Sequence, residues 1–369
     1  MITTRRHAEP LTTPVRVMIA AAACAIAPLA GAESWQFIPS PNGGSFENRL
    51  FGADASSAQD VWAVGVSTNA LLDRADTLAM RWDGEAWTIV PTPNPNAALQ
   101  SNRLADVAVI APDDAWAVGS STFGPFTSPL LLHWNGSAWS IDDGAAGLPP
   151  SSARAVHAIA PDDVWVVGFI TQPAGFATLA AHYDGSDWTA TNMPNAQFGG
   201  MQFEAIHGLA SDDIWAAGYE NPGNGVFAPL LAHWDGSEWT TLNPAPLGGC
   251  TLHGVAMIAS DDAWAVGRCP VSGLGDQPYA VHWDGESWTP AEMPIIDDGH
   301  ARLEGVVARA ADDVWAAGTN GTIDGIPRPF IMHFDGVAWQ EVSTPASGGS
   351  HEWFHDMAIA PSGELWAVG

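Results

Sequence analysis

Lysine is absent from this chain of 369 residues, so all 12 of its basic side chains are arginines. Aspartate and glutamate together number 41, which gives a formal net charge of −29 at pH 7. A surface of this charge repels polyanions. The sequence therefore predicts no nucleic-acid partner and no attraction to anionic membranes, and we expect a monomer.

Long apolar runs are also scarce. The run Val17–Leu29 is too short to span a bilayer comfortably, and no second stretch approaches spanning length, so we expect no transmembrane segment. Arg5, Arg6 and Arg16 precede the run, and the small residues Ala30-Gly31-Ala32 follow it. This order is typical of a secretory signal peptide. We expect residues 1–32 to be removed and residues 33–369 to form one domain that is secreted, periplasmic or at the cell surface.

Only three cysteines are present. Cys24 follows Ala22-Ala23, a weak likeness to a lipoprotein box, so lipidation at Cys24 stays open as an alternative to cleavage near Ala32. Cys250 and Cys269 flank an expected hairpin whose turn lies midway between them. They should face each other on paired strands, and in an exported protein this predicts a disulfide.

Tryptophan is plentiful, with 19 residues against 3 tyrosines. The tryptophans recur in two motifs that repeat about every fifty residues. One motif has the form Asp/Glu-x-Trp-x-x-Gly, and its tryptophans are Trp62, Trp116, Trp165, Trp215, Trp264, Trp315 and Trp366. A second motif has an aromatic residue, Asp-Gly or Asn-Gly, and a tryptophan, namely Trp87, Trp139, Trp188, Trp239, Trp288 or Trp339. Asp-Gly between apolar segments is a strong hairpin signal.

Each repeat divides into four short strands, and 38 glycines and 28 prolines supply the turns. Four-stranded units repeated in this way are typical of propeller blades. We therefore expect an all-β, seven-bladed β-propeller of four-stranded antiparallel blades. The seventh blade would be a composite of the N- and C-termini, from Ser34–Pro39, Phe354–Ala360 and Leu365–Gly369. The repeat pattern contains no third strand for this blade, so we expect the blade either to be incomplete or to be completed by further residues of the chain.

The repeat resembles that of kelch and galactose-oxidase-type propellers, and the Trp-rich propeller repeats of secreted bacterial proteins. The matching segments are Trp215-Ala-Ala-Gly218, His233-Trp-Asp-Gly236 and Trp239, with Met193-Pro194 and Met293-Pro294 ending two fourth strands. The kelch double glycine is here a single glycine, and the Asp-to-Trp turn is tighter. The resemblance implies the architecture but not the copper chemistry, because Tyr183, Tyr219 and Tyr279 are the only tyrosines. We expect no cofactor.

The Asp-Gly-x-x-Trp turns are also similar to the Asp-box of sialidases, although the spacing differs by one residue. A sialidase-like site would need an arginine cluster, a tyrosine and a glutamate. Arginines at the expected starts of first strands could meet near the axis, namely Arg49, Arg103, Arg154 and Arg302. No tyrosine is obviously placed beside them, so no residue is assigned a catalytic role.

Two other repeated features look like metal ligands but are interpreted as scaffold. The acidic pairs Asp113-Asp114, Asp162-Asp163, Asp212-Asp213, Asp261-Asp262 and Asp312-Asp313 are better explained as turn caps, because two carboxylates fall short of calcium's six to eight oxygens. The repeated histidines His133, His182, His233, His282 and His333 occur once per blade, so they should lie far apart around the ring. We expect no metal site.

Function is therefore sought where the blades differ. Eleven residues before each repeat tryptophan stand Phe51, Ala105, Arg154, Glu204, His253, Glu304 and His355. The polar members, Arg154, Glu204, His253, Glu304 and His355, are the candidate ligand-binding residues, and we expect them near the axis. The alternative is a solvated channel rim without a ligand. Aromatic contacts are expected from the long loops on the same face, at Phe123, Phe126, Phe176, Phe227 and Trp353.

Three functions remain open from the sequence. The first is a non-enzymatic extracellular module that binds a protein or glycan. The second is a secreted carbohydrate-active enzyme, either glycosidase or sialidase-like or a lyase, with its site on the variable-loop face. The third is a cell-surface structural scaffold. Fold alone does not choose among them.

Overall fold

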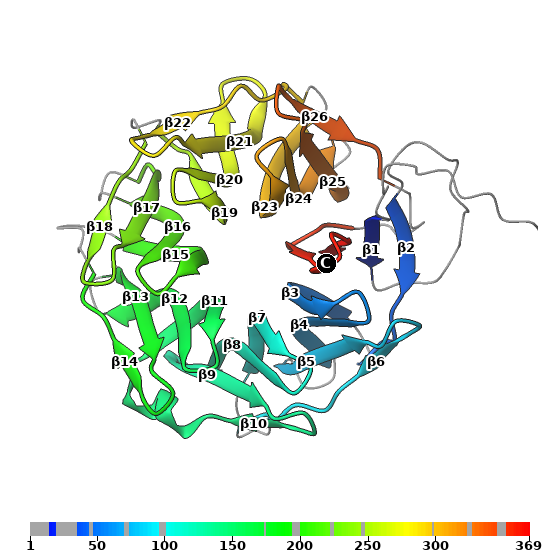
Figure 1. The fold of residues 1–369 in the computed structure, drawn as a ribbon, viewed down its shortest axis with the longest axis vertical. Coiled ribbons are helices and arrows are strands. Elements are labelled where there is room, and N and C mark those ends of the chain that lie inside the picture. The colour runs from blue at the N-terminus through cyan, green and yellow to red at the C-terminus, as the bar shows by residue number, and fades with distance from the viewer. Residues whose placement is uncertain are drawn as a thin grey trace, which may run out of the picture.

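The computed structural model describes twelve stretches of the chain: residues 15–19, 35–43, 47–69, 74–95, 101–172, 175–193, 200–221, 225–244, 248–296, 299–322, 327–344 and 352–369. These stretches are almost entirely β-structure, apart from one short 3-10 helix, η1 (Asp143–Gly147). Blade-like sheets surround a central axis, with the first strand of each blade innermost (Figure 1).

Six blades are four-stranded and antiparallel, and each follows chain order from the axis outward. The first blade contains β3 (Glu47–Ser57), β4 (Asp60–Asn69), β5 (Arg74–Trp82) and β6 (Trp87–Ile89). The second contains β7 (Ser101–Ala111), β8 (Asp114–Phe123), β9 (Phe126–Trp134) and β10 (Trp139–Ile141). The third contains β11 (Ser151–Ala160), β12 (Asp163–Gln172), β13 (Gly175–Tyr183) and β14 (Trp188–Ala190). The fourth blade contains β15 (Gly200–Ala210), β16 (Asp213–Asn221), β17 (Ala228–Trp234) and β18 (Trp239–Thr241). The fifth contains β19 (Thr251–Ala259), β20 (Asp262–Val271), β21 (Gly275–Trp283) and β22 (Trp288–Pro290). The sixth contains β23 (Gly299–Ala310), β24 (Asp313–Thr322), β25 (Pro327–Phe334) and β26 (Trp339–Val342).

The prediction of seven antiparallel blades is wrong, because the structure has six. The two ends of the chain form a different, mixed sheet in the order β2 (Trp35–Pro39), β1 (Val15–Ile19), β28 (Leu365–Val368) and β27 (Asp356–Ile359). β1 pairs parallel with both β2 and β28, whereas β27 and β28 pair antiparallel. The repeat supplies no third strand here, and β1, which does not belong to the repeat, takes that place. β27 contacts β3 and β23, so this sheet lies between the first and sixth blades.

Tryptophans hold neighbouring sheets together. The repeat tryptophan on each second strand is almost fully buried, and Trp62 and Trp366 are 0% exposed. Trp62 packs between Trp134 and Trp139 of the next blade, with both ring centroids 5.0 Å away. Trp366 of the terminal sheet packs in the same way against the first blade, at 5.5 Å from Trp82 and from Trp87. Such aromatic pairs add to the large apolar area that each ring buries.

The repeated polar residues serve the scaffold. In five blades the repeated histidine lies 2.8 Å from the second aspartate of the acidic pair, and the pairs are His133–Asp114, His182–Asp163, His233–Asp213, His282–Asp262 and His333–Asp313. In the first blade Arg81 takes the place of the histidine, 2.6 Å from Asp60. The hairpin aspartates accept backbone hydrogen bonds within their own turns, as Asp184 does from Ser186 and Asp187.

The predicted disulfide is confirmed: Cys250 and Cys269 are bonded, with Cα atoms 4.1 Å apart. Their neighbours Thr251 and Arg268 are paired residues of β19 and β20. In the chain-entropy model a crosslink over a loop of this size stabilises the fold by about 3 kcal/mol.

Some expected loops are strands instead. Where a long loop was expected after Gly119, β8 and β9 continue as a regular ladder that ends in the pair Phe123 and Phe126.

The predicted signal peptide and Cys24 lie mostly outside the described residues, which include only Val15–Ile19 of that segment. Among the described residues, no helix has the length and apolarity needed to cross a membrane.

Candidate functional site

The candidate binding residues occupy one special backbone position. In each of the six blades the first and second strands shift register at two places. The shift nearer the start of the first strand leaves one residue out of the pairing: Phe51, Ala105, Arg154, Glu204, His253 or Glu304. These are the residues eleven places before the repeat tryptophan. Each is therefore the extra residue of a β-bulge, a device that redirects a side chain.

The repeat glycine explains why the bulge recurs. A Cβ on Gly65 would lie 1.9 Å from the carbonyl oxygen of Arg49, and the equivalent glycines of the other blades show the same conflict. No other residue fits without a backbone shift. The glycine therefore allows the backbone of the first strand to lie directly against the second strand, and the bulge accompanies that close approach.

The bulged side chains meet in a cavity of about 230 Å³ on the propeller axis. Its lining includes Phe51, Ala105, Arg154, Glu204, His253, Glu304 and His355, so the structure brings all five candidate residues to one place. His355 comes from the terminal sheet, just before β27, where its backbone N–H donates to the Val368 carbonyl. The cavity contains a mixture of cations, carboxylates and imidazoles rather than a continuous apolar surface.

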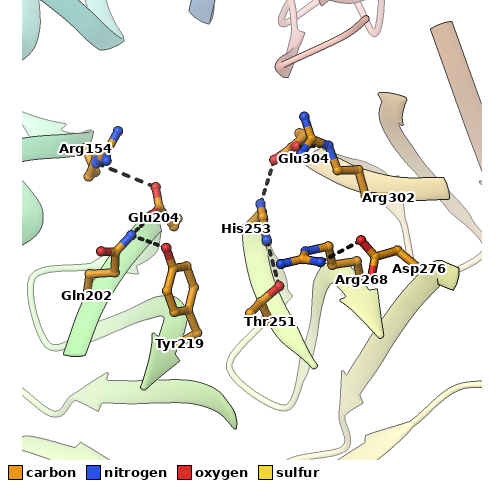
Figure 2. A network of polar contacts seen from close by, with 10 residues as sticks. All are labelled: Arg154, Gln202, Glu204, Tyr219, Thr251, His253, Arg268, Asp276, Arg302 and Glu304. Carbon is orange, nitrogen blue, oxygen red and sulfur yellow. Dashed lines mark hydrogen bonds and ion pairs between the residues drawn. The ribbon is translucent and has the colours of Figure 1, made fainter. Parts of the chain in front are cut away.

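One half of the site is built around Glu204. Its carboxylate accepts a short hydrogen bond from the Gln202 amide and lies 3.8 Å from Arg154 Nε (Figure 2). The Gln202 amide also lies 2.5 Å from the Tyr219 hydroxyl. Gln202 and Tyr219 are paired across β15 and β16, so the ladder fixes their separation. Burial raises the pKa of Tyr219 to about 12, which keeps its phenol protonated.

The other half is centred on His253. Its Nε2 lies 2.9 Å from the Thr251 hydroxyl, and its Nδ1 lies 2.6 Å from Glu304 Oε2. Arg302 Nε is 2.7 Å from the other oxygen of Glu304 (Figure 2). Burial opposes charge on both groups, but their mutual attraction and hydrogen bond prevail. The pKa of His253 is raised, and that of Glu304 is lowered to about 2.

Thr251, His253 and Glu304 have the connectivity of a nucleophile, a base and an orienting carboxylate. Two observations disfavour that chemistry. The Thr251 residue is only 2% exposed. The raised pKa of His253 favours the imidazolium, which cannot accept a proton from the hydroxyl. The arrangement is better suited to holding fixed charges and hydrogen-bonding groups than to transferring an acyl group.

Deeper along the axis, polar side chains bridge neighbouring blades. Three aspartates accept hydrogen bonds from backbone N–H groups of the next blade: Asp356 from Ala53 at 2.9 Å, Asp54 from Val109 at 2.7 Å and Asp106 from Val156 at 2.9 Å. His157 contacts the Gly208 carbonyl at 3.0 Å, and His207 Nδ1 accepts from the backbone of Met257 at 3.2 Å. These contacts join consecutive inner strands around the cavity.

Burial shifts the pKa values of this inner ring. It raises the pKa of Asp54 to about 6 and that of Asp106 to about 7, and it raises that of Asp356 well above its usual value. Burial also lowers the pKa of His157 to about 4 and that of His207 to about 3. Within the described residues, no group of three or more histidine, cysteine, aspartate or glutamate side chains is arranged to hold a metal ion.

Several site residues were not singled out from the sequence. Gln202 and Thr251 stand two places before a bulged residue, and Tyr219 and Arg268 directly follow the repeat glycine. Arg268 pairs with Asp276 at 2.6 Å and lies beside His253 in Figure 2. A comparison of the blades at these two positions would have found all four. The expected rim aromatics are exposed at Phe123, Phe126, Phe176 and Phe227, whereas Trp353 is partly buried beneath Arg49.

Comparison with known proteins agrees with the fold. No protein-family model and no curated protein sequence matches the chain. Among solved structures, the chain is similar to YCF48 bound to D1 peptide, with 16% identity, a TM-score of 0.53, and coverage of 87% of this chain and 90% of that one. It is also similar to a PL25 ulvan lyase bound to a GlcA(1-4)Rha3S saccharide, with 10% identity, a TM-score of 0.53, and coverage of 86% and 89%.

A fungal lectin of Aleuria aurantia, described as a six-bladed β-propeller that recognises fucose, gives 13% identity and a TM-score of 0.48, with coverage of 83% of this chain and 100% of that one. At these identities the comparisons show a likeness of fold alone, and the β-propeller class follows from the six blades of this structure. The comparisons do not confirm a kelch or galactose-oxidase type.

Proposed function

We propose that this protein is a non-enzymatic extracellular binding module that holds a protein or glycan ligand at the axial site. The observation that carries the proposal is the set of bulged residues. They direct different polar side chains into one cavity, while the repeated tryptophans, histidines and aspartates are used by the scaffold. Sites that bind small groups combine a concave shape with a few placed polar groups.

The enzymatic alternative has less support. A tyrosine nucleophile of the sialidase kind would need an easily ionised phenol, whereas burial raises the pKa of Tyr219 to about 12. The burial of Thr251 and the raised pKa of His253 disfavour acyl transfer. The Glu204 and Glu304 carboxylates are already engaged with Arg154 and His253, respectively.

The proposal is tested with a ligand obtained by screening the exported protein against glycan arrays and by protein capture. The triple variant Arg154→Ala, Glu204→Gln, His253→Ala should lower the affinity for that ligand at least 100-fold. The three residues lie outside the strand register, so the fold should persist, and circular dichroism and thermal unfolding would check this. Affinity is measured by isothermal titration calorimetry.

The matched control replaces exposed acids on the opposite face, Glu238→Gln with Glu286→Gln. These residues lie on hairpin turns at the far ends of the strands from the bulged side chains. The control should bind as the wild type does. If the folded triple variant binds with wild-type affinity, the axial site is not the binding site.

A further inference from the structure

The arginines at the axial site differ in whether a nearby carboxylate neutralises their charge. Four of them have a carboxylate close by: Arg49 with Glu47 at 2.7 Å, Arg302 with Glu304 at 2.7 Å, Arg268 with Asp276 at 2.6 Å, and Arg154 with Glu204 at 3.8 Å. For Arg103, no carboxylate pairs with it among the residues that the structure describes. Its Nε is buried and makes no hydrogen bond, and the same is true of Arg154 Nε. Two guanidinium groups therefore carry unused donors at this site.

Arg103 is held in place by packing rather than by an ion pair. Its guanidinium lies over the Phe51 ring, 4.4 Å from the centroid, and Phe51 is the bulged residue of the neighbouring blade. Arg49 lies similarly over Trp353 at 5.3 Å, and Arg154 over Phe169 at 5.2 Å. Aromatic faces fix the planes of these guanidinium groups and leave their edges free to donate hydrogen bonds.

The arginines are close enough to repel one another. Burial, together with the charges of Arg154 and Arg49, lowers the pKa of Arg103 to about 10, although the charge of Glu204 opposes this shift. Burial lowers the pKa of His355 to about 4; the charge of Glu304 opposes this shift, and the charges of Arg302, Arg103 and Arg49 add to it. Of these arginines, Arg154 lines the cavity, and Arg103 lies beside it, over the ring of the lining residue Phe51. Cations held close together and partly buried cost free energy unless an anion joins them.

We propose that Arg103, with Arg49 and Arg154, binds a carboxylate group of the ligand, and that this ligand is an acidic glycan. The inference rests on the proposed binding function and specifies its ligand. A planar carboxylate matches the guanidinium edge and accepts two hydrogen bonds from it. It would use the donors that the chain leaves without partners.

The surroundings of the arginines favour a sugar as the carrier of the carboxylate. Glu204 and Glu304 are paired with Arg154 and His253, but each carboxylate oxygen has two lone pairs and can accept a further hydrogen bond from a ligand hydroxyl. Gln202 and Tyr219 add further polar groups (Figure 2). A carboxylate alone would be repelled by these acids. A uronic acid residue carries hydroxyl donors beside its carboxylate, so it complements both the arginines and the glutamates. The cavity of about 230 Å³ is of a size to take one such ring.

The experiment compares two small probes on the exported protein by calorimetry or saturation-transfer NMR. Methyl β-D-glucuronide should bind at least tenfold more tightly than methyl β-D-glucoside, which has a hydroxymethyl group in place of the carboxylate. Arg103→Gln should remove this preference, and Arg103→Lys should retain part of it. The control Arg328→Gln changes the same charge at an exposed position of β25 and should leave binding unchanged. If Arg103→Gln does not fold, Arg49→Gln replaces it.

Equal binding of the two probes, or wild-type binding by a folded Arg103→Gln variant, would overturn the inference. A third outcome would also overturn it: the glucuronide does not bind, whereas an acidic peptide with a free C-terminal carboxylate binds more tightly than the same peptide with a C-terminal amide. The proposed function has its own test. If the triple variant loses the screened ligand while Arg103→Gln keeps it, the axial site stands and the carboxylate assignment fails.

Discussion

At the scale of single residues, buried carboxylates on the axis carry a cost that depends on pH. Asp106 accepts a hydrogen bond from Val156 and has a pKa raised to about 7, against an ordinary value of 3.8. The native state therefore binds more protons than the unfolded state between about pH 4 and pH 7. The free energy of unfolding contributed by Asp106 falls as pH rises through that window and is lowest above it.

Asp106→Asn removes the charge but keeps only one of two acceptors, because Oδ1 accepts from Val107 N at 2.7 Å and Oδ2 from Val156 N at 2.9 Å. Loss of the second acceptor costs the same at every pH, so the expected signature is a pH dependence. We expect the stability of the variant relative to the wild type to improve by roughly 1–3 kcal/mol from pH 4.5, where the native carboxyl is protonated, to pH 8, since one pKa unit corresponds to about 1.4 kcal/mol. Urea denaturation at both pH values measures it. Asp187→Asn, at an exposed turn, is the control, and an equal difference in stability at both pH values would contradict the explanation.

At the residue scale, part of the cavity lining could be predicted from the sequence. Counting from the repeat tryptophan located Arg154, Glu204, His253, Glu304 and His355, all of which line the cavity. It did not reveal that these positions are bulges. A bulge depends on which residue faces which across two strands, and the apolar pattern does not encode a one-residue slip. The contact of His253 with Thr251 was missed for the same reason.

At the scale of strands, the repeat glycine controls the geometry of the site. We expect Gly65→Ala to destabilise the protein by about 2 kcal/mol or more, because a Cβ would meet the Arg49 carbonyl at 1.9 Å. The control is Gly147→Ala at the end of η1, where an added Cβ has no neighbour within 4 Å. Thermal and urea unfolding of the two variants should differ clearly. Similar stability of both would show that the strands separate at little cost.

Strand assignments from the sequence succeeded where the repeat is regular and failed at the termini. The six complete repeats gave six blades, because turn residues and tryptophans mark every strand. The terminal sheet could not be predicted in the same way. Its third position is occupied by β1, a segment that carries no repeat motif and pairs in parallel. The segment Val15–Ile19 is apolar except for Arg16, and such a composition suits a strand and a signal peptide equally.

At the scale of the whole molecule, β1 lies within the predicted signal peptide, so cleavage during export should remove β1 from the domain. We expect the exported protein to begin at Glu33 and therefore to lack β1. Its intact mass should show the loss of residues 1–32, with Cys250 and Cys269 alkylated only after reduction. A mass that includes residues 15–19, or two thiols that react without reduction, would contradict the expected processing and the exported state of the disulfide.

The bulges have a consequence for how such a molecule can change. Each axial side chain stands outside the pairing register, so its identity is independent of the alternating pattern that packs the blades. Phe51, Ala105, Arg154, Glu204, His253 and Glu304 already show six different environments on nearly the same backbone. A substitution at any one of these positions therefore changes the chemistry of the cavity and leaves the packing of the tryptophans between blades unchanged. New specificities are therefore accessible by single substitutions at an almost constant scaffold.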